Sequence, residues 1–279
     1  MNIKNIIKLE FKLFLTRKEF LYTFTIMMAL VCLAFLLKCI GLYGRDFSMV
    51  YPASQLWFGW TPNITYAKPL TGLFYLIALP FVVSLVYSDT YYIDNNTGMV
   101  KNIIVRCKKS KYLLAKGLVV YTSGFIVIFI PLIVEQVLCL FVSPITGRLD
   151  ILHTKAYEFP FVKYIQFSEM FVNHPYLRNF LIISLASLFG GSISLFSYAL
   201  SFINKKSRLF VVAFPGILYI AYNLVVEFFD ERWLGLSYYL YSSVTFSGRT
   251  SYIIIVLAAM TLLSTFIIVS KSMISKDEL

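Results

Sequence analysis

Charged residues are scarce in this chain of 279 residues. Asp, Glu, Lys and Arg make up 14% of it, whereas a typical soluble domain has about 25%. Hydrophobic residues make up 59%, and a chain so poor in charge cannot cover its own surface with polar groups. A lipid bilayer is therefore the expected solvent. This composition excludes a large soluble catalytic domain, a disordered chain and a disulfide scaffold.

The sequence signatures of several kinds of functional site are missing as well. There is no G-x-x-x-x-G-K-[ST] motif, so the chain cannot bind ATP through a P-loop, and there is no H-E-x-x-H zinc motif. The four cysteines form no C-x-x-C pair, and no histidine lies near them to complete a zinc site. The two histidines, His153 and His174, lie in one expected outer loop. We therefore predict no catalytic residue, no metal and no cofactor on this chain.

Long apolar runs are what the chain does have. Six of them approach the roughly 20 residues that a membrane-spanning helix needs. They cover residues 20–43, 69–88, 117–141, 179–204, 209–226 and 250–270. The run 47–67 is also free of charge but rich in polar residues and Trp, so we predict a loop with Trp57 and Trp60 at the level of the lipid headgroups. The predicted fold is an all-α membrane protein, one domain over residues 1–279.

The distribution of Lys and Arg predicts the orientation of these spans. If the N-terminus is cytoplasmic, sixteen of the 25 Lys and Arg residues lie in cytoplasmic segments, which are also the shorter segments. Membrane proteins usually retain such residues on that side. We therefore predict that both termini are cytoplasmic. The net charge of +11 follows from the same pattern, so we expect no nucleic-acid partner.

The N-terminal segment, residues 3–19, has an amphipathic pattern. Its apolar and basic residues fall on different sides of a helix: Ile3, Ile6, Ile7, Leu13 and Phe14 against Lys4, Lys8 and Lys12. The pattern predicts a helix on the inner leaflet with its lysines near anionic headgroups. A positive flank that orients the first span is the alternative, and the two are compatible.

The loop after the second span, residues 94–116, contains an acid, a glycine, a short apolar stretch and a basic turn. The residues concerned are Asp94, Gly98, Lys101, Asn102, Ile103, Ile104 and Arg106. The apolar stretch is too short to cross a membrane and too apolar for a solvated linker. We predict a helix parallel to the membrane that offers Val100, Ile103 and Ile104 to a partner. A basic loop that only anchors the topology is the alternative.

This segment resembles the cytoplasmic segment of ABC-2-type ABC transporter permeases. That segment has an acid, a glycine, often a Lys-Asn pair, a short apolar helix and then a basic turn. The resemblance is greatest to Firmicute permeases of peptide export or antimicrobial-peptide immunity, and the N-terminal helix and six spans extend it over the whole chain. The chain departs from it at Arg106-Cys107-Lys108, where many relatives have Pro or Gly before the basic turn.

The resemblance implies a permease subunit of the bacterial cytoplasmic membrane that exports a peptide, an antibiotic or a lipid-like molecule. It implies two separate ATPase subunits per complex, which hold ATP and Mg²⁺, and a second permease copy, either the same chain or a sister chain. It fits a re-entrant outer hairpin to residues 227–249, and it places at or near the ATPase contact Asp94, Gly98, Lys101, Asn102, Ile103, Ile104 and Arg106. Two other interpretations stay open: a substrate-binding membrane subunit of an uptake system, and an intramembrane enzyme.

Polar and small residues within the spans are the remaining candidates. Glu135 and Glu227 lie near the outer ends of the third and fifth spans, and an intramembrane carboxylate is a candidate for a translocation path. The alternative is that each reaches the headgroups or is hydrogen-bonded within the bundle. Pro80, Pro131 and Pro215 mark either gating kinks or simple bends. Small residues at helical spacing in the fourth span predict close helix packing: Ala186, Gly190, Ser194, Ser197 and Ser201.

The predicted orientation can be tested with reporter fusions. A reporter fused ahead of Met1 and one fused after Leu279 should both report the cytoplasm, because six spans return the chain to its starting side. Green fluorescent protein and alkaline phosphatase, which are active on opposite sides of a bacterial membrane, make the measurement. Termini on opposite sides would end the six-span topology.

Overall fold

The computed structural model describes residues 3–44, 50–59, 66–105, 107–145, 166–203, 207–241 and 250–274. Within these ranges every regular element is a helix, and six helices are long and apolar enough to cross a membrane. The all-α membrane fold with six candidate spans is therefore confirmed. The spans are α2 (Lys18–Leu42), the consecutive segments α3 (Lys68–Leu73), η3 (Phe74–Ala78) and α4 (Leu79–Tyr87), then α7 (Lys109–Val142), α9 (Pro175–Leu200), α10 (Arg208–Phe228) and α12 (Thr250–Ile274).

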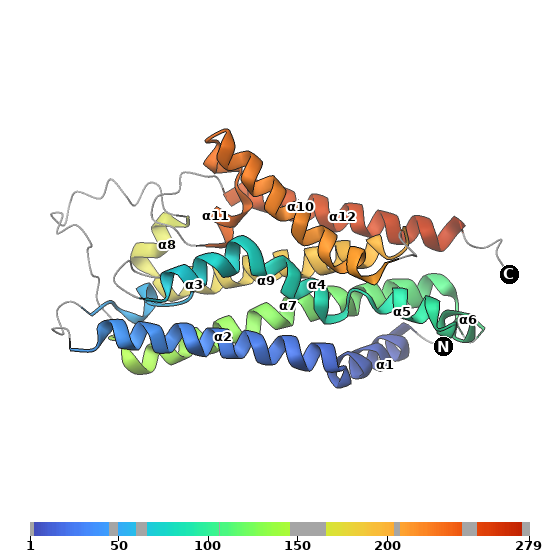
Figure 1. Cartoon of the computed structure of the whole chain (residues 1–279), viewed down its shortest axis with the longest axis horizontal. Coiled ribbons are helices and arrows are strands. Elements are labelled where there is room, and N and C mark those ends of the chain that lie inside the picture. Colours follow the sequence, from blue (N-terminus) through green and yellow to red (C-terminus); the bar gives the residue numbers. More distant parts are fainter. Residues whose placement is uncertain are drawn as a thin grey trace.

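Short helices precede and connect the spans. They are α1 (Ile3–Thr16), η2 (Ala53–Gln55), α5 (Thr90–Asn96), α6 (Met99–Ile104), α8 (Ser168–Asn173), η5 (Arg232–Leu234) and α11 (Leu236–Leu240). The spans form one elongated bundle (Figure 1). Helix α1 and the end of α12 lie at the same end of it, together with α5 and α6 (Figure 1). We call this the α6 end and the opposite end the α11 end.

Three spans, α7, α9 and α12, differ by four residues or more from their predicted bounds, and α12 ends at Ile274 instead of residue 270. Helix α7 begins at Lys109, well before residue 117, because its first turns bind side chains of α1 and α5 rather than lipid. Helix α9 ends at Leu200 instead of reaching residue 204. The hydroxyl of Ser201 donates to the Tyr198 carbonyl at 2.6 Å, which closes the end of the helix.

The predicted helix over residues 3–19 is two helices. The chain is extended at Arg17, where φ is −74° and ψ is 134°. The Thr16 hydroxyl donates back to the carbonyls of Lys12 and Leu13 in the last turn of α1. Helix α1 packs against α7 and α2, so it does not rest on lipid alone. Its placement on the inner leaflet stays a prediction: Ile6 and Phe14 of the apolar set are buried in the bundle, Leu13 is exposed, and Glu10 is also buried.

Helices α7 and α9 form the centre of the bundle and approach closely where their residues are small. A Cβ atom on Gly124 of α7 would lie 2.7 Å from the Cβ of Ser194 and 2.9 Å from the Gly190 carbonyl oxygen. All five small residues predicted to pack are buried, four of them on α9 and Ser201 directly after its end. Gly190 and Ser194 face α7, whereas the Ser197 hydroxyl donates to the Val211 carbonyl of α10 at 2.7 Å.

The second span contains a π-helical turn, η3, directly before Pro80 of α4. Pro80 has no N–H to donate to the carbonyl one α-helical turn earlier, so the regular hydrogen-bond ladder is interrupted here. Within η3 the Tyr75 carbonyl accepts a hydrogen bond at 2.8 Å from the Tyr219 hydroxyl of α10. This contact joins the second and fifth spans at the irregular turn.

The seam between α7 and α9 predicts an effect of a single methyl group. Gly124→Ala should lower the free energy of unfolding by about 1–3 kcal/mol, because the new Cβ meets backbone that cannot turn aside. Gly72→Ala is the matched control, since a Cβ on this helical glycine meets nothing within 4 Å. The thermal midpoint of the detergent-solubilised protein measures both. Equal midpoints for the two variants would contradict the close contact.

Candidate functional site

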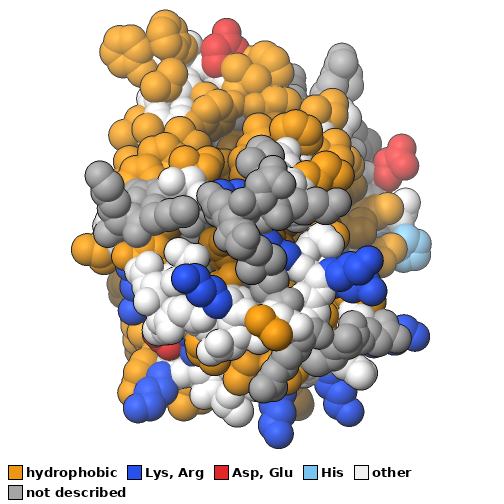
Figure 2. Space-filling view, turned by 90° about the vertical axis from the view of Figure 1, so that its right-hand side faces the viewer, with side chains coloured by type: hydrophobic (Ala, Val, Ile, Leu, Met, Phe, Trp, Pro, Cys, Tyr) orange, Lys and Arg blue, Asp and Glu red, His pale blue; other side chains and the backbone are white. Residues whose placement is uncertain are grey.

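Most of the described lysines at the α6 end are exposed, whereas the described acids there are buried or partly buried. Lys and Arg side chains gather over this face, seen end-on in Figure 2. The exposed lysines include Lys4, Lys8 and Lys12 of α1 and Lys101 of α6. The acids that the structure describes at this end, by contrast, are Glu10, Glu19, Asp89 and Asp94, all of which make ion pairs within the chain. The surface left for a partner is therefore basic.

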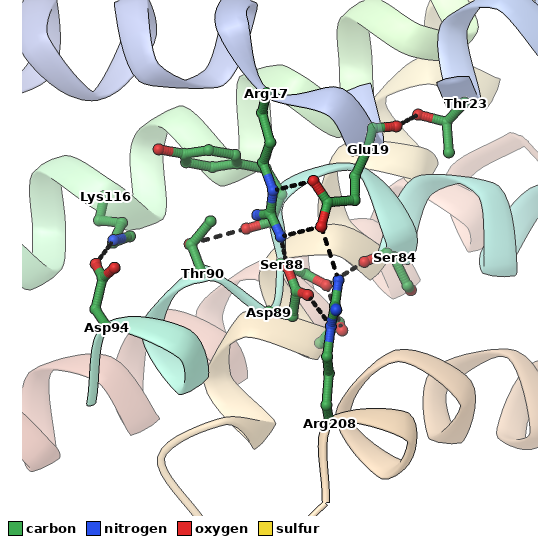
Figure 3. A network of polar contacts seen from close by, with 12 residues as sticks. Arg17, Glu19, Thr23, Ser84, Ser88, Asp89, Thr90, Asp94, Lys116 and Arg208 are labelled. Atoms are coloured by element: carbon green, nitrogen blue, oxygen red, sulfur yellow. Dashed lines mark hydrogen bonds and ion pairs between the residues drawn. The ribbon is translucent and has the colours of Figure 1, made fainter. Parts of the chain in front are cut away.

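Four of the charged side chains form a closed group, which we call the arginine ring: Arg17, Glu19, Asp89 and Arg208 (Figure 3). Asp89 is fully buried and lies 2.7 Å from Arg17 and 2.6 Å from Arg208. Glu19 lies 3.0 Å from each of the same two guanidinium groups. The ring thus joins the α1–α2 junction, the end of the second span and the start of α10.

Arg17 keeps its charge in this ring. Burial alone lowers its pKa, but hydrogen bonds to Glu19 and Asp89 and the charges of these carboxylates raise the pKa above its usual value. Its guanidinium also lies over the Tyr87 ring, 5.5 Å from the ring centre. A charged group with two carboxylate partners fixes the positions of the elements that carry them.

A second charged group, the lysine cluster, lies beside the ring and is centred on Lys116 of α7. Lys116 is buried, pairs with Asp94 of α5 and lies 3.7 Å from Glu10 of α1. The Tyr112 hydroxyl donates to Asp94 at 2.6 Å, and the Tyr87 hydroxyl donates to Glu10 at 2.8 Å. Tyr87 therefore touches both groups. Together they connect α1, α2, α4, α5, α7 and α10.

The predicted coupling residues lie next to the lysine cluster. Asp94 is part of it, and Gly98 ends the following turn with φ of 75°, a conformation that favours glycine. Helix α6 then starts at once. Lys101 and Asn102 are exposed on it. Arg106 lies outside the described residues, and so does the side chain of Ile104.

The apolar face of α6 points inward. Val100 has only 6% of its surface exposed, and Ile103 packs partly against the core. The prediction that Val100 is offered to a partner is therefore wrong, because residues three apart on a helix share a face and this face meets the bundle. The apolar side chains that do face outward are Met99 and, just after the helix, Val105, which is 86% exposed.

No protein-family model matches this chain, and no match is found among curated proteins or solved structures. The site is therefore interpreted from its own geometry. Among the residues that the structure describes, no group of three or more His, Cys, Asp or Glu is placed to hold a metal ion. The charged side chains of the arginine ring and the lysine cluster are paired with one another, so the arrangement is suited to holding the elements that carry them in fixed relative positions.

A third polar cluster lies at the α11 end, and the segment 50–59 folds onto it. Lys38 and Glu135 are both fully buried and form an ion pair. The Phe58 N–H donates to Glu135 at 2.7 Å, the Gln136 amide donates to the Ala53 carbonyl at 3.1 Å, and the Asn179 amide donates to the Ser54 carbonyl at 2.9 Å.

These hydrogen bonds satisfy backbone groups that burial would otherwise leave unpaired. Trp57 and Phe58 are consequently carried fully into the bundle. The headgroup-level position of Trp57 stays a prediction, although its side chain is buried in protein, and Trp60 lies outside the described residues.

The two predicted pathway carboxylates have different surroundings. Glu135 is hydrogen-bonded within the bundle, as the alternative interpretation required, and its place on a translocation path stays a prediction. Glu227 is exposed near the end of α10 and accepts a hydrogen bond at 2.8 Å from the Tyr238 hydroxyl of α11. The chain turns after α10 into η5 and α11, while residues 242–249 of the predicted hairpin lie outside the described residues.

Sequence reasoning missed the arginine ring and the partners of Glu10 and Glu135. One signal was available. Lys38 interrupts an otherwise apolar run and Glu135 interrupts another, both near the outer ends of their spans. Opposite charges buried at the same depth predict a pair. For Asp89 and Arg208 no such signal exists, since both lie at the edges of spans where single charges are common.

The Lys38–Glu135 pair predicts a non-additive double mutant. Lys38→Met should lower the free energy of unfolding by about 3–5 kcal/mol, because it leaves a buried carboxylate without its cation. Adding Glu135→Gln should recover part of the loss, since Gln is uncharged and still accepts from the Phe58 N–H. Thermal unfolding in detergent measures the series, with the exposed Lys12→Met as control. Additive losses would contradict the pairing.

Proposed function

We propose that this chain is the membrane-spanning permease subunit of an ATP-driven ABC transporter of the ABC-2 type. The observation that carries the proposal is the position of α6. This short helix lies at the end of the bundle that holds both termini, in the loop whose sequence resembles the ATPase-coupling segment of that family. It presents Met99, Lys101, Asn102 and Val105 outward.

The connections of α6 to the spans support a coupling role. Helix α5, which precedes it, is tied by Asp94 to Tyr112 and Lys116 of α7. Lys116 continues the contact to Glu10 of α1. A displacement of α6 would therefore be transmitted to the second and third spans through ion pairs and hydrogen bonds as well as through the backbone. Networks of hydrogen bonds and salt bridges between rigid helices can carry energetic coupling between sites.

The proposed complex contains two copies of a separate ATPase, which bind ATP and Mg²⁺, and two permeases, identical or sister chains. The α6 end would face the bacterial cytoplasm, in agreement with its exposed lysines. The bundle would export a peptide, an antibiotic or a lipid-like molecule across the cytoplasmic membrane. A substrate-binding subunit of an uptake system or an intramembrane enzyme would need no ATPase-docking surface at α6.

Purification from the natural host separates these possibilities. The tagged chain, extracted in mild detergent, should bring with it a P-loop ATPase in stoichiometric amount, detected by mass spectrometry. The same experiment shows whether a second, different permease is present. A chain that repeatedly purifies intact and alone would reject the transporter and favour the uptake-subunit or enzyme interpretation.

A single substitution tests the docking surface. Val105→Asp should lower the amount of co-purified ATPase about tenfold or more, because it places a charge at an exposed apolar position next to α6. Ile145→Asp is the matched control, an equally simple change at an exposed apolar residue of the α11 end. Membrane content of both variants should equal that of the unsubstituted chain. Undiminished ATPase recovery with Val105→Asp would reject α6 as the docking element.

A further inference from the structure

The last three spans enclose a pocket that has no part in the polar clusters. It has a volume of about 420 Å³, within the range of small-molecule sites. Phe189 and Ile193 of α9 form its floor and are almost completely buried. Leu218 of α10 and Leu263 of α12 also line it and are 50% and 52% exposed, so the pocket opens to the side.

The pocket exists because α10 and α12 each pack on α9 but hardly on each other. Helix α10 is inclined to the other spans (Figure 1), and Pro215, where its hydrogen-bond ladder is interrupted, lines the pocket. Opposite it, α12 contributes Ala259, whose small side chain leaves space. Leu236 of α11 covers the pocket from the α11 end. The lining residues of α10 and α12 lie near the middle of these helices, at the depth of the hydrocarbon layer.

Among the described residues, the pocket lining is almost wholly apolar. The hydroxyls in this lining belong to Tyr219 and Tyr222, and both are already hydrogen-bonded. The Tyr219 hydroxyl donates to the Tyr75 carbonyl at 2.8 Å. The Tyr222 hydroxyl lies 3.1 Å from the Leu234 carbonyl and 2.6 Å from the Tyr252 hydroxyl. A polar ligand would lose its hydrogen bonds to water on entry, whereas a hydrocarbon chain would lose none.

We propose that the pocket binds one acyl chain of a bilayer phospholipid, which enters between α10 and α12. The bilayer supplies this chain at the depth of the opening. An apolar cavity holds no stable water, and an empty one forfeits the dispersion contacts of its whole lining. The acyl chain restores those contacts and fills the gap that keeps α10 and α12 apart. This binding does not depend on the proposed transport function.

Photolabelling in vesicles tests the proposal without any cargo or partner protein. The purified chain is reconstituted into phosphatidylglycerol vesicles that contain a small fraction of phosphatidylglycerol with a mid-chain diazirine. After illumination, mass spectrometry should find the adducts concentrated on pocket residues such as Met260 and Tyr222. Adducts spread evenly over the lipid-facing surfaces of α10 and α12 would overturn the proposal.

One pair of variants fills the pocket, and a second pair is its matched control. Ala259→Phe and Leu263→Phe each place a ring in the pocket, and each should lower pocket labelling about fivefold or more. Ala258→Phe and Leu262→Phe make the same changes one residue earlier, at exposed positions of α12, and should leave the labelling unchanged. Leu263 is half exposed, so its variant keeps the test valid even if Ala259→Phe does not fold.

Two other results would also overturn the proposal. One is full pocket labelling in a filled variant that keeps the thermal midpoint and elution volume of the original chain. The other is an unlabelled pocket together with cross-links between two copies at α10 or α12, which would assign it to a second copy of the chain.

Discussion

A carboxylate that leaves water costs several kcal/mol unless a cation and hydrogen-bond donors replace its hydration. This chain buries Glu10, Asp89 and Glu135 at once. Each of the three has a Lys or Arg partner from a different helix. Those partners lie far apart in sequence, so every buried acid brings distant elements together. The packing of α1 on α7 and the burial of the segment 50–59 both follow from this requirement.

The two ends of the bundle use the same chemistry for different purposes. At the α11 end, Lys38 and Glu135 hold a loop that would otherwise expose its backbone to the hydrocarbon layer. At the α6 end, the arginine ring and the lysine cluster connect helices that meet the membrane edge. Between these ends the bundle depends on close contact of small residues, as at Gly124 and Ser194, and has no buried ion pair among its described residues.

The apolar runs were sufficient to predict six spans, because the length of an apolar helix is a local property of sequence. The small residues of α9 and of its C-terminal end could also be predicted as packing positions, and all five are buried. The partners of the charged residues could not be predicted from the sequence. Lys38 and Glu135 are 97 residues apart, and no local sequence pattern shows that their side chains pair. The burial of Val100 could not be predicted either, because an apolar residue of a short helix fits a partner-binding surface and the core of the bundle equally well.

The length of α7 has a consequence for the reach of the bundle. Its 34 residues extend about 50 Å, whereas the hydrocarbon layer is about 30 Å thick. The surplus includes Lys109–Lys116, because Tyr112 and Lys116 bind side chains of α5 and α1 rather than lipid, so this helix is long enough to carry α5 and α6 beyond the acyl region. A protein bound at α6 would then sit clear of the lipid surface instead of pressing into it. Lys116 and Glu10 are themselves buried, and salt screens buried pairs less than exposed charges, so ionic strength should affect this pair less than it affects the exposed lysines nearby.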